Sequence, residues 1–392
     1  MHPAIVFGLI RLLFGLSFGA HATVYGPFLV SIGLSVSQVF WVNVFFAGAI
    51  MLGEVPTGML ADKRGRGWSV RMGVLCWALA SALYLCAVGF WTAALSEGIA
   101  GIGHAFISGS LNAWVTDAMD MRGADDRRAR VFGNGFIAHR IGLVAGGLVG
   151  AWVGDWSLRA TWALSAVMLL LALVVCRVCM GDRGECAGRE HSYRALFIAA
   201  RSVVLRPDMR WLVLLCVCCV LWAPMNYFWS IWFQGCTGLS RVGWIWVLIQ
   251  VGMFAGAWLV KRLKGTDSRG DQRRLLIGFS VASASLPLLA LAGCHAAAYP
   301  ILFLDEAARG AYGPLEDSYV QGRAEKSNGA TVESMVSLVT SFGNTVAIIL
   351  IGAATYGMPI SRASIAAMWI VSGALALACA AAFWAHYFLK RR

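Results

Sequence analysis

Charged side chains are scarce in this chain, and their scarcity is the first constraint on its environment. Asp, Glu, Lys and Arg make up 13% of the 392 residues, whereas a soluble globular protein has roughly 25%. Apolar residues reach 59%, and the mean hydropathy is +0.70. A water-soluble globular domain is therefore excluded, and most of the surface is expected to face lipid.

Several enzyme and metal-site motifs are also missing. No G-x-x-x-x-G-K-[ST] phosphate loop occurs, so ATP drive within this chain is not expected. No H-E-x-x-H pattern occurs, which argues against a membrane-embedded metalloenzyme. The match Gly15-Leu16-Ser17-Phe18-Gly19 to G-x-S-x-G lies inside an apolar run, not at the strand-to-helix turn that a nucleophile elbow requires. Cys176 and Cys179 have the spacing of metal ligands, but no second pair completes the set. We predict neither a metal nor a cofactor.

Long apolar runs are what the chain has in abundance. A helix needs about 20 predominantly apolar residues to cross the hydrocarbon core. We count twelve such runs and predict an all-α membrane protein with twelve transmembrane helices. The runs are 4–30, 36–60, 68–88, 92–118, 131–153, 159–180, 209–233, 240–263, 273–293, 297–322, 332–354 and 361–388.

The basic residues are distributed unequally between the two sides of these runs. Alternate turns and the C-terminal tail hold 26 of the 32 Lys and Arg, whereas the opposite turns hold only Arg159, Arg241 and Arg362. Cytoplasmic loops carry such an excess, so both termini are predicted to be cytoplasmic. The net charge of +12 therefore orients the chain, and we predict no nucleic-acid binding.

A polar stretch divides the chain in the middle. Residues 181–208 are predicted to be a cytoplasmic linker between two six-helix bundles, 1–180 and 209–392. Weak internal repetition agrees with this division, because Glu97 and Glu306 hold corresponding places and each precedes a glycine by four residues.

One short motif identifies a family. The stretch Gly58-Met59-Leu60-Ala61-Asp62-Lys63-Arg64-Gly65-Arg66-Gly67 joins the second and third apolar runs. It resembles the G-x-L-A-D-[RK]-x-G-R-[RK] signature of the major facilitator superfamily, with a glycine in place of the last basic residue. The resemblance implies two pseudo-symmetric bundles that work by alternating access. It also implies a multi-pass monomer in a bacterial inner membrane, whose partners are a small-molecule substrate, protons and the lipid bilayer.

The function implied by this resemblance is secondary active transport. Similarity to bacterial efflux-type permeases favours a proton-coupled antiporter that exports small amphipathic compounds. The alternative is a proton-coupled importer of a nutrient or organic anion, and a remote one is a transporter-like sensor without transport. Drug–proton antiporters have a glycine-rich fifth helix that contains Gly-Pro; here the glycines occur without the proline, and tight helix packing is the competing interpretation. These glycines are Gly142, Gly146, Gly147 and Gly150.

The signature also implies a conformational latch. Asp62 and Arg66 lie four residues apart, and Asp117 ends the fourth apolar run on the same side. In the family picture these three side chains hold the cytoplasmic side closed, and Gly58 permits close contact at the end of the second helix. The other interpretation is a solvated turn that only sets topology.

Two ionisable residues are predicted in the cytoplasmic third of the membrane, Arg11 and Glu54. A buried charge costs from ~3 to over 10 kcal/mol, so each needs a partner or a purpose. We assign Glu54, next to the signature, a structural or gating role. Arg11 is expected either to pair with it or to extend to the headgroups.

Other ionisable residues are predicted deeper in the membrane or toward its outer side, and they are the candidates for proton coupling. A carboxyl removed from water can exchange a proton when its access changes, which favours Glu97 and Glu306 over Asp305 and His104. Asp305 and Glu306 lie four and three residues from Arg309, so that pairing within one helix is the competing interpretation. The candidates for lining a substrate cavity are Arg140, Arg309, Tyr25, Asn226 and Tyr312.

Overall fold

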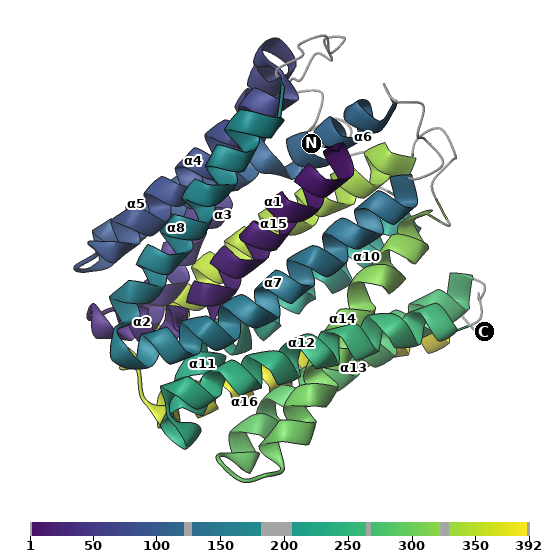
Figure 1. Cartoon of the computed structure of the whole chain (residues 1–392). Helices are drawn as coiled ribbons and strands as arrows, with labels where there is room; N and C mark the ends of the chain where they lie inside the picture. Colours follow the sequence, from purple (N-terminus) through teal and green to yellow (C-terminus); the bar gives the residue numbers. More distant parts are fainter. Residues whose placement is uncertain are drawn as a thin grey trace. The chain divides into compact units, whose positions relative to one another are not determined.

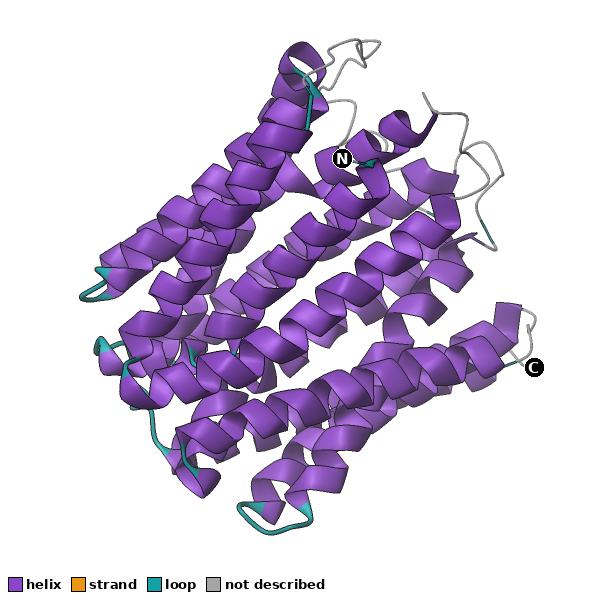
Figure 2. Ribbon diagram, viewed as in Figure 1, coloured by secondary structure: helices purple, strands orange, loops and turns teal. Residues whose placement is uncertain are grey.

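The chain is helical throughout the part that its structure describes. The computed structural model describes residues 2–120, 128–181, 206–263, 268–321, 323 and 329–389 (Figure 1). No strand occurs within these ranges (Figure 2). A helix satisfies its own backbone hydrogen bonds, which hydrocarbon demands of any spanning segment. The predicted all-α class is confirmed.

The helices follow the predicted apolar runs. Ten helical segments of the described residues are long and apolar enough to cross a membrane, with α10, η2 and α11 counted together as the one span Met209–Thr237. The helices α5 and α14 do not meet that criterion; they contain Glu97, His104 and a run of charges from Asp305 to Asp317, which lower their hydropathy. Twelve spans therefore stay a prediction. The bounds are α1 Pro3–Ala22, α2 Tyr25–Ser31, α3 Val36–Arg64, α4 Arg66–Leu85, α5 Phe90–Ser108, α6 Ser110–Asp120, α7 Arg128–Trp156, α8 Leu158–Cys179, α10 Pro207–Cys218, η2 Cys219–Trp222, α11 Ala223–Thr237, α12 Leu239–Arg262, α13 Ser268–Ala292, α14 Ala298–Gln321, α15 Gly329–Ala354 and α16 Arg362–Leu389.

Three runs that we predicted as single helices are broken. Run 4–30 divides into α1 and α2, and run 209–233 divides into α10, the 3-10 helix η2 and α11. Pro27 and Pro224 explain these two breaks, because a proline cannot bond the carbonyl four residues earlier and its ring collides with it. Those carbonyls belong to Thr23 and Val220, which lie in the two breaks. The third break, in run 92–118, falls at Gly109 between α5 and α6.

The described residues form two compact units. The first contains α1 to α8 together with Thr237–Trp246 and Gly352–Tyr356, and the second contains the remaining described residues from α10 onward. In the first unit α1 packs along α7 and α8, while α5 packs along α3 and α4 (Figure 1). In the second unit α13 packs against α14 and α16. The predicted linker 181–208 lies mostly outside the described residues, and the division into two bundles stays a prediction.

Glycines bring α1 and α7 into backbone contact. A Cβ atom on Gly15 of α1 would lie 2.2 Å from the carbonyl oxygen of His139, and one on Gly146 of α7 would lie 2.3 Å from that of Leu16. Gly142 and Gly150 are equally close to α1. Helices in lipid associate through such close packing, because the lipid tails are as apolar as the helices and the hydrophobic effect does not drive the helices together. This contact supports the packing interpretation of the glycine pattern.

Candidate functional site

The signature stretch forms a helical corner rather than an extended loop. Helix α3 continues to Arg64 and α4 begins at Arg66, so a single residue separates them. That residue is Gly65, whose φ of 95° lies in the left-handed region that favours glycine. Its N–H donates to Ala61 O at 2.9 Å and closes the last turn of α3. Asp62 and Gly58 lie in the last two turns of α3, before this corner.

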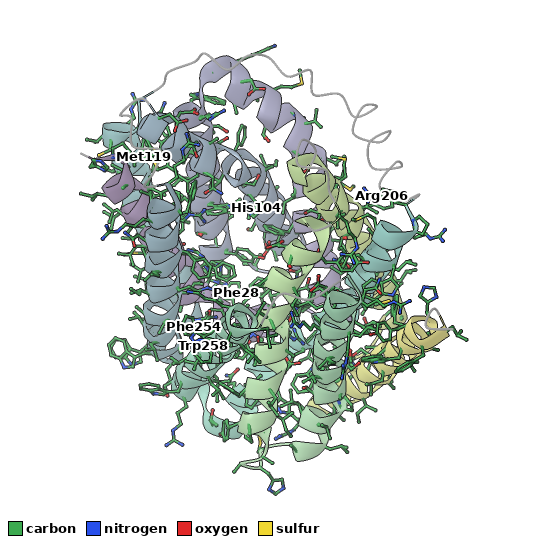
Figure 3. The ribbon with its side chains drawn as sticks, turned by 90° about the vertical axis from the view of Figure 1, so that its right-hand side faces the viewer. Phe28, His104, Met119, Arg206, Phe254 and Trp258 are labelled. Atoms are coloured by element: carbon green, nitrogen blue, oxygen red, sulfur yellow. A yellow bond between two sulfur atoms is a disulfide. The ribbon has the colours of Figure 1, made fainter. Side chains whose placement is uncertain are left out.

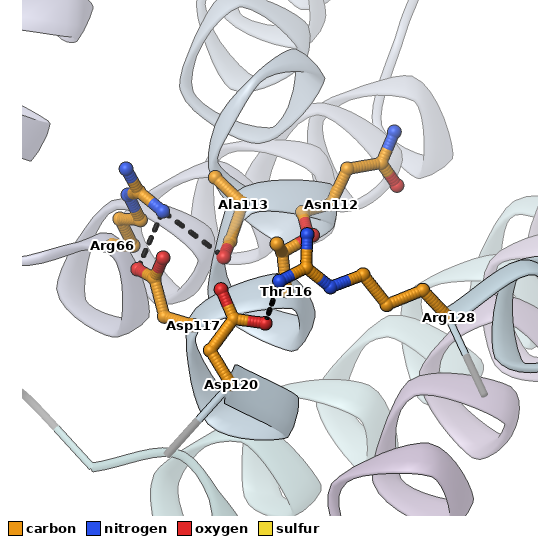
Figure 4. Close-up of polar contacts among 7 residues, drawn as sticks. All are labelled: Arg66, Asn112, Ala113, Thr116, Asp117, Asp120 and Arg128. Atoms are coloured by element: carbon orange, nitrogen blue, oxygen red, sulfur yellow. Dashed lines mark hydrogen bonds and ion pairs between the residues drawn. The ribbon is translucent and has the colours of Figure 1, made fainter. Parts of the chain in front are cut away.

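Arg66 and Asp117 form an ion pair, as the latch hypothesis requires of them. The Arg66 guanidinium donates to Asp117 Oδ2 at 2.5 Å and to Ala113 O at 3.0 Å, which fixes the start of α4 to α6 (Figure 4). A second pair, between Arg128 and Asp120, ties the start of α7 to the end of α6 (Figure 4). Helix α6 therefore carries two carboxylates that each hold the beginning of another helix.

Arg11 has a partner different from the predicted one. Its guanidinium donates to Asn112 Oδ1 at 2.7 Å and lies over the Phe7 ring, 5.2 Å from the ring centroid. Glu54 is exposed and forms neither a hydrogen bond nor an ion pair with any described residue. The suggested Arg11–Glu54 pair is therefore wrong in this structure, in which the Asn112 amide of α6 accepts the hydrogen bond from Arg11.

Glu97 is the centre of a polar cluster in the first unit. Its Oε1 accepts hydrogen bonds from the hydroxyls of Tyr25 at 2.9 Å and Tyr84 at 2.7 Å. The Asn43 amide donates to the Tyr25 hydroxyl at 3.3 Å. Four helices thus contribute to one cluster: α2, α3, α4 and α5. Two hydroxyl donors stabilise the ionised carboxylate, whereas removal from water favours the neutral acid.

Aromatic rings enclose this cluster on one side. The Trp162 ring of α8 stacks on Tyr84, with centroids 4.0 Å apart, and on His21, with centroids 4.6 Å apart. Trp162 is 2% exposed, and its Nε1 has no hydrogen-bond partner in the described part of the chain. Sequence analysis missed Tyr84 and Trp162. The one available signal was that Tyr84 is the sole tyrosine of the run 68–88.

Two predicted site residues of the first unit do not take part in the Glu97 cluster. His104 of α5, labelled in Figure 3, is exposed and lies near the rings of Phe46 and Trp77, with centroids 6.0 and 6.3 Å away. The Arg140 guanidinium lies over the Phe136 ring, 5.1 Å from its centroid. His104 lies two turns further along α5 than Glu97, and Arg140 lies on α7, so neither side chain bonds Glu97 in the described residues.

Arg309 is the centre of a second cluster, in the second unit. Its Nε lies 2.9 Å from Asp305 Oδ2, its Nη1 donates to Asn226 Oδ1 at 2.5 Å, and its Cζ lies 5.1 Å from the Trp222 ring centroid. The Asp305 side chain is fully buried and that of Arg309 is 10% exposed. Pairing within α14, the competing sequence interpretation for Arg309, is therefore observed.

Glu306 and Tyr312 border this second cluster. Glu306 is 8% exposed, and its carboxylate forms no hydrogen bond to the residues that the structure describes. It lies against Gly252 of α12, where a Cβ atom would be 3.0 Å from Glu306 Cβ. Tyr312 packs edge-on against Trp222, with centroids 5.8 Å apart, and its hydroxyl lies 3.6 Å from Cys216 Sγ.

The two clusters are built alike within their own units. In each, a polar side chain just after a proline-associated helix break contacts a partly buried ionisable group on a helix that lacks membrane-helix hydropathy. Tyr25 follows the α1–α2 break and contacts Glu97 of α5; Asn226 follows η2 and contacts Arg309 of α14. Transporter sites are typically formed where helices are discontinuous. We therefore take each cluster as a candidate functional site within its own unit.

Comparison with known proteins places the chain in a family. A family model described as Major Facilitator Superfamily matches residues 7–348. Among solved structures, the nucleoside transporter NupG superposes with a TM-score of 0.82 at 14% identity, covering 99% of each chain. No curated protein sequence matches the chain.

Two further transporter structures have the same fold. A bacterial homologue of the human lysosomal transporter Spinster gives a TM-score of 0.70 at 16% identity, covering 100% of this chain and 98% of its own. The peptide transporter POT in complex with alafosfalin gives 0.75 at 14% identity, covering 97% and 93%. Identities this low carry the fold and not the substrate.

Proposed function

The chain belongs to the Major Facilitator Superfamily, and we propose that this membrane transporter couples the movement of a small molecule to a proton gradient. Export of an amphipathic compound is the favoured direction. The protein works as a monomer in a bacterial inner membrane, with both termini cytoplasmic, by alternating access. We assign functional roles to the Glu97 cluster and to the Arg309 cluster, each within its own unit.

The observation that carries the proposal is the environment of Glu97. A carboxylate that accepts two tyrosine hydroxyls can release those bonds when it takes up a proton, because the neutral acid needs fewer donors. Tyr25 is placed by the α1–α2 break, so any movement of α2 relative to α5 changes the partners of Glu97. Protonation and helix position are thereby linked.

The charge of the Arg309 cluster supports a second proton site. One guanidinium faces two buried carboxyls, Asp305 and Glu306, so full ionisation leaves an excess negative charge in a buried place. Asp305 has the ion pair with Arg309, whereas Glu306 has no hydrogen bond in the described residues. Glu306 is accordingly the group that we assign to proton exchange in this unit.

We assign the conformational latch to the signature corner. The Arg66–Asp117 pair joins α4 to α6 at the corner where α3 ends, and its side chains are 30% and 50% exposed. An ion pair this exposed contributes ~0–1 kcal/mol, which suits a contact that must break and re-form in every cycle. Asp62, Gly58 and Glu54, all on α3, are the proposed moving part of the latch.

The alternative is import of an organic anion, for which sequence analysis considered the guanidiniums of Arg140 and Arg309. Arg309 is occupied by Asp305 and Asn226, so its guanidinium is not available to bind an anion. This difference favours the export proposal over the alternative.

The test is a flux assay on purified protein in liposomes that contain a pH-sensitive dye. A thermal-shift screen of amphipathic cations and organic anions first identifies a ligand, and a gradient of that ligand is then imposed. Wild-type protein should move protons with the ligand, and Glu97→Gln should bind the ligand but move no protons. Tyr84→Phe, which keeps the ring and removes one hydroxyl, should be intermediate.

The matched control is Asp155→Asn, an exposed carboxyl at the end of α7. It should behave as wild type. If wild-type protein carries the ligand with no proton movement, proton coupling is refuted. If Glu97→Gln moves protons at the wild-type rate, the role assigned to Glu97 is wrong while transport itself stands.

A further inference from the structure

Two cysteines meet at one end of the second unit. Cys236 lies in the last turn of α11 and Cys294 lies in the connection between α13 and α14. They are 58 residues apart in the sequence, yet their Cα atoms are 5.3 Å apart and their sulfur atoms are bonded. The other eight described cysteines are free.

We propose that Cys236 and Cys294 are oxidised to a disulfide on the non-cytoplasmic face of the membrane, and that this bond fastens the end of α11 to the α13–α14 connection. The charge pattern predicts that both positions face outward, since the only basic residues of the outward turns are Arg159, Arg241 and Arg362. Disulfides persist in oxidising compartments and are rare in the cytosol. The cysteine chemistry thus gives the same orientation as the charges, by an independent argument.

Arg362, the first residue of α16, lies against the two sulfur atoms. Its Nη2 is 2.7 Å from Cys294 Sγ and 3.2 Å from Cys236 Sγ, and its Cζ is 4.5 Å from the Trp232 ring centroid. A cation beside a sulfur favours the thiolate, which is the nucleophile in thiol–disulfide exchange. The guanidinium therefore promotes formation of the bond as well as joining α16 to it.

The oxidation is a two-electron exchange with a second disulfide. One thiolate attacks a disulfide of an oxidising protein and forms a mixed disulfide; the other cysteine then displaces that protein as a dithiol. The pair loses two protons and two electrons, and the oxidant disulfide receives the electrons. The chain itself supplies only the two cysteines and the neighbouring cation.

The consequence for the second unit is a rigid attachment. Helix α13 already packs against α14 and α16. At this end α11 contacts α16 through the Trp232–Trp369 ring pair and α14 through Phe233 and Tyr299, and the disulfide and Arg362 add a covalent bond and a cation to these contacts. Asn226, which bonds Arg309 of α14, lies ten residues before Cys236, roughly 15 Å along α11 at 1.5 Å per residue. The bond therefore helps to hold Asn226 in register with Arg309. This inference does not depend on proton coupling or on the identity of the substrate.

The test uses a membrane-impermeant maleimide coupled to polyethylene glycol, applied to intact cells that express the full chain. Cys86 is exposed, free and predicted to face outward, so the background for all samples is Cys86→Ser. In this background we expect no labelling until an impermeant phosphine reductant is added. Adding Cys236→Ser should expose Cys294 to labelling without reductant, and the converse variant should expose Cys236. The double variant should remain unlabelled throughout.

Two outcomes overturn the proposal. Equal labelling of the Cys86→Ser chain with and without reductant means that the two thiols are free. Labelling that appears only after cells are made permeable means that this end faces the cytoplasm. Because a cysteine variant can fail to fold, the unmodified chain is also alkylated and digested without reduction; a cross-linked peptide containing both cysteines is expected, and two alkylated peptides refute the bond.

The structural role is measured separately. Reductant should lower the melting temperature of the purified wild-type chain. The Cys236→Ser/Cys294→Ser variant should melt at that lower temperature, and reductant should not change its melting temperature. Equal melting of oxidised and reduced wild type refutes the attachment. Arg362→Gln should slow re-formation of the bond after the reductant is removed, with Arg362→Lys in between; an unchanged rate removes Arg362 from the proposal.

Discussion

The contact between α1 and α7 gives the most quantitative prediction, because the obstacle to a new side chain is backbone. In Gly146→Ala the Cβ would lie 2.3 Å from Leu16 O, whereas ordinary contact begins at 3.4 Å. The shortfall is about 1 Å, and a helix carbonyl cannot turn aside to remove it. The two helices must separate, and overpacking of this kind costs about 1–3 kcal/mol.

The matched control lies on the same helix. A Cβ atom on Gly133 of α7 would meet nothing within 4 Å. Gly133→Ala should therefore be neutral or slightly stabilising, since alanine exceeds glycine in helix propensity by up to about 1 kcal/mol. The expected gap between the two variants is about 1–4 kcal/mol. Gly147→Ala should fall between them, because its obstacle is the Trp246 side chain, which can move.

The assay is thermal unfolding in detergent, followed by the fraction of monodisperse protein after heating. For a unit of 150–250 residues, 1 kcal/mol corresponds to about 2–4 °C, so Gly146→Ala should melt at least about 2 °C below Gly133→Ala. Equal melting temperatures would show that α1 and α7 are not in backbone contact. The packing interpretation of the glycine pattern would then be refuted.

Three further predictions concern the charged groups. Asp62→Asn should express and insert but transport poorly, and wild-type flux in liposomes would exclude it from the latch. Arg309→Gln should lower stability by about 3–5 kcal/mol, because it leaves the fully buried Asp305 without its counter-ion, and thermal unfolding in detergent measures the loss. The double variant Asp305→Asn/Arg309→Gln should recover most of that loss, and a double variant no better than the single one would show that the ion pair is not what the stability depends on.

The environment, the helix positions and the family followed from the sequence. Each of these depends on quantities that accumulate along the chain: apolar length, the side on which basic residues lie, and one contiguous motif. Pro27 and Pro224 follow the breaks at Thr23 and Val220 by four residues. Pro56, Pro287 and Pro314 lie inside the continuous helices α3, α13 and α14, so the position of a proline alone did not predict a break.

Side-chain contacts between different helices could not be predicted from the sequence. The Tyr25–Glu97 bond spans 72 residues, Arg11–Asn112 spans 101 and Cys236–Cys294 spans 58. Which side chains meet over such separations depends on the rotation of each helix about its own axis and on the helix it packs against. A hydropathy pattern carries neither quantity in a chain whose helices are apolar on nearly every side. Local composition therefore determined that the chain crosses a membrane, and it predicts that both termini are cytoplasmic. Only the packing of the helices decided that Tyr84 also donates to Glu97 and that Arg11 donates to Asn112 and not to Glu54. The same packing brought two distant cysteines together.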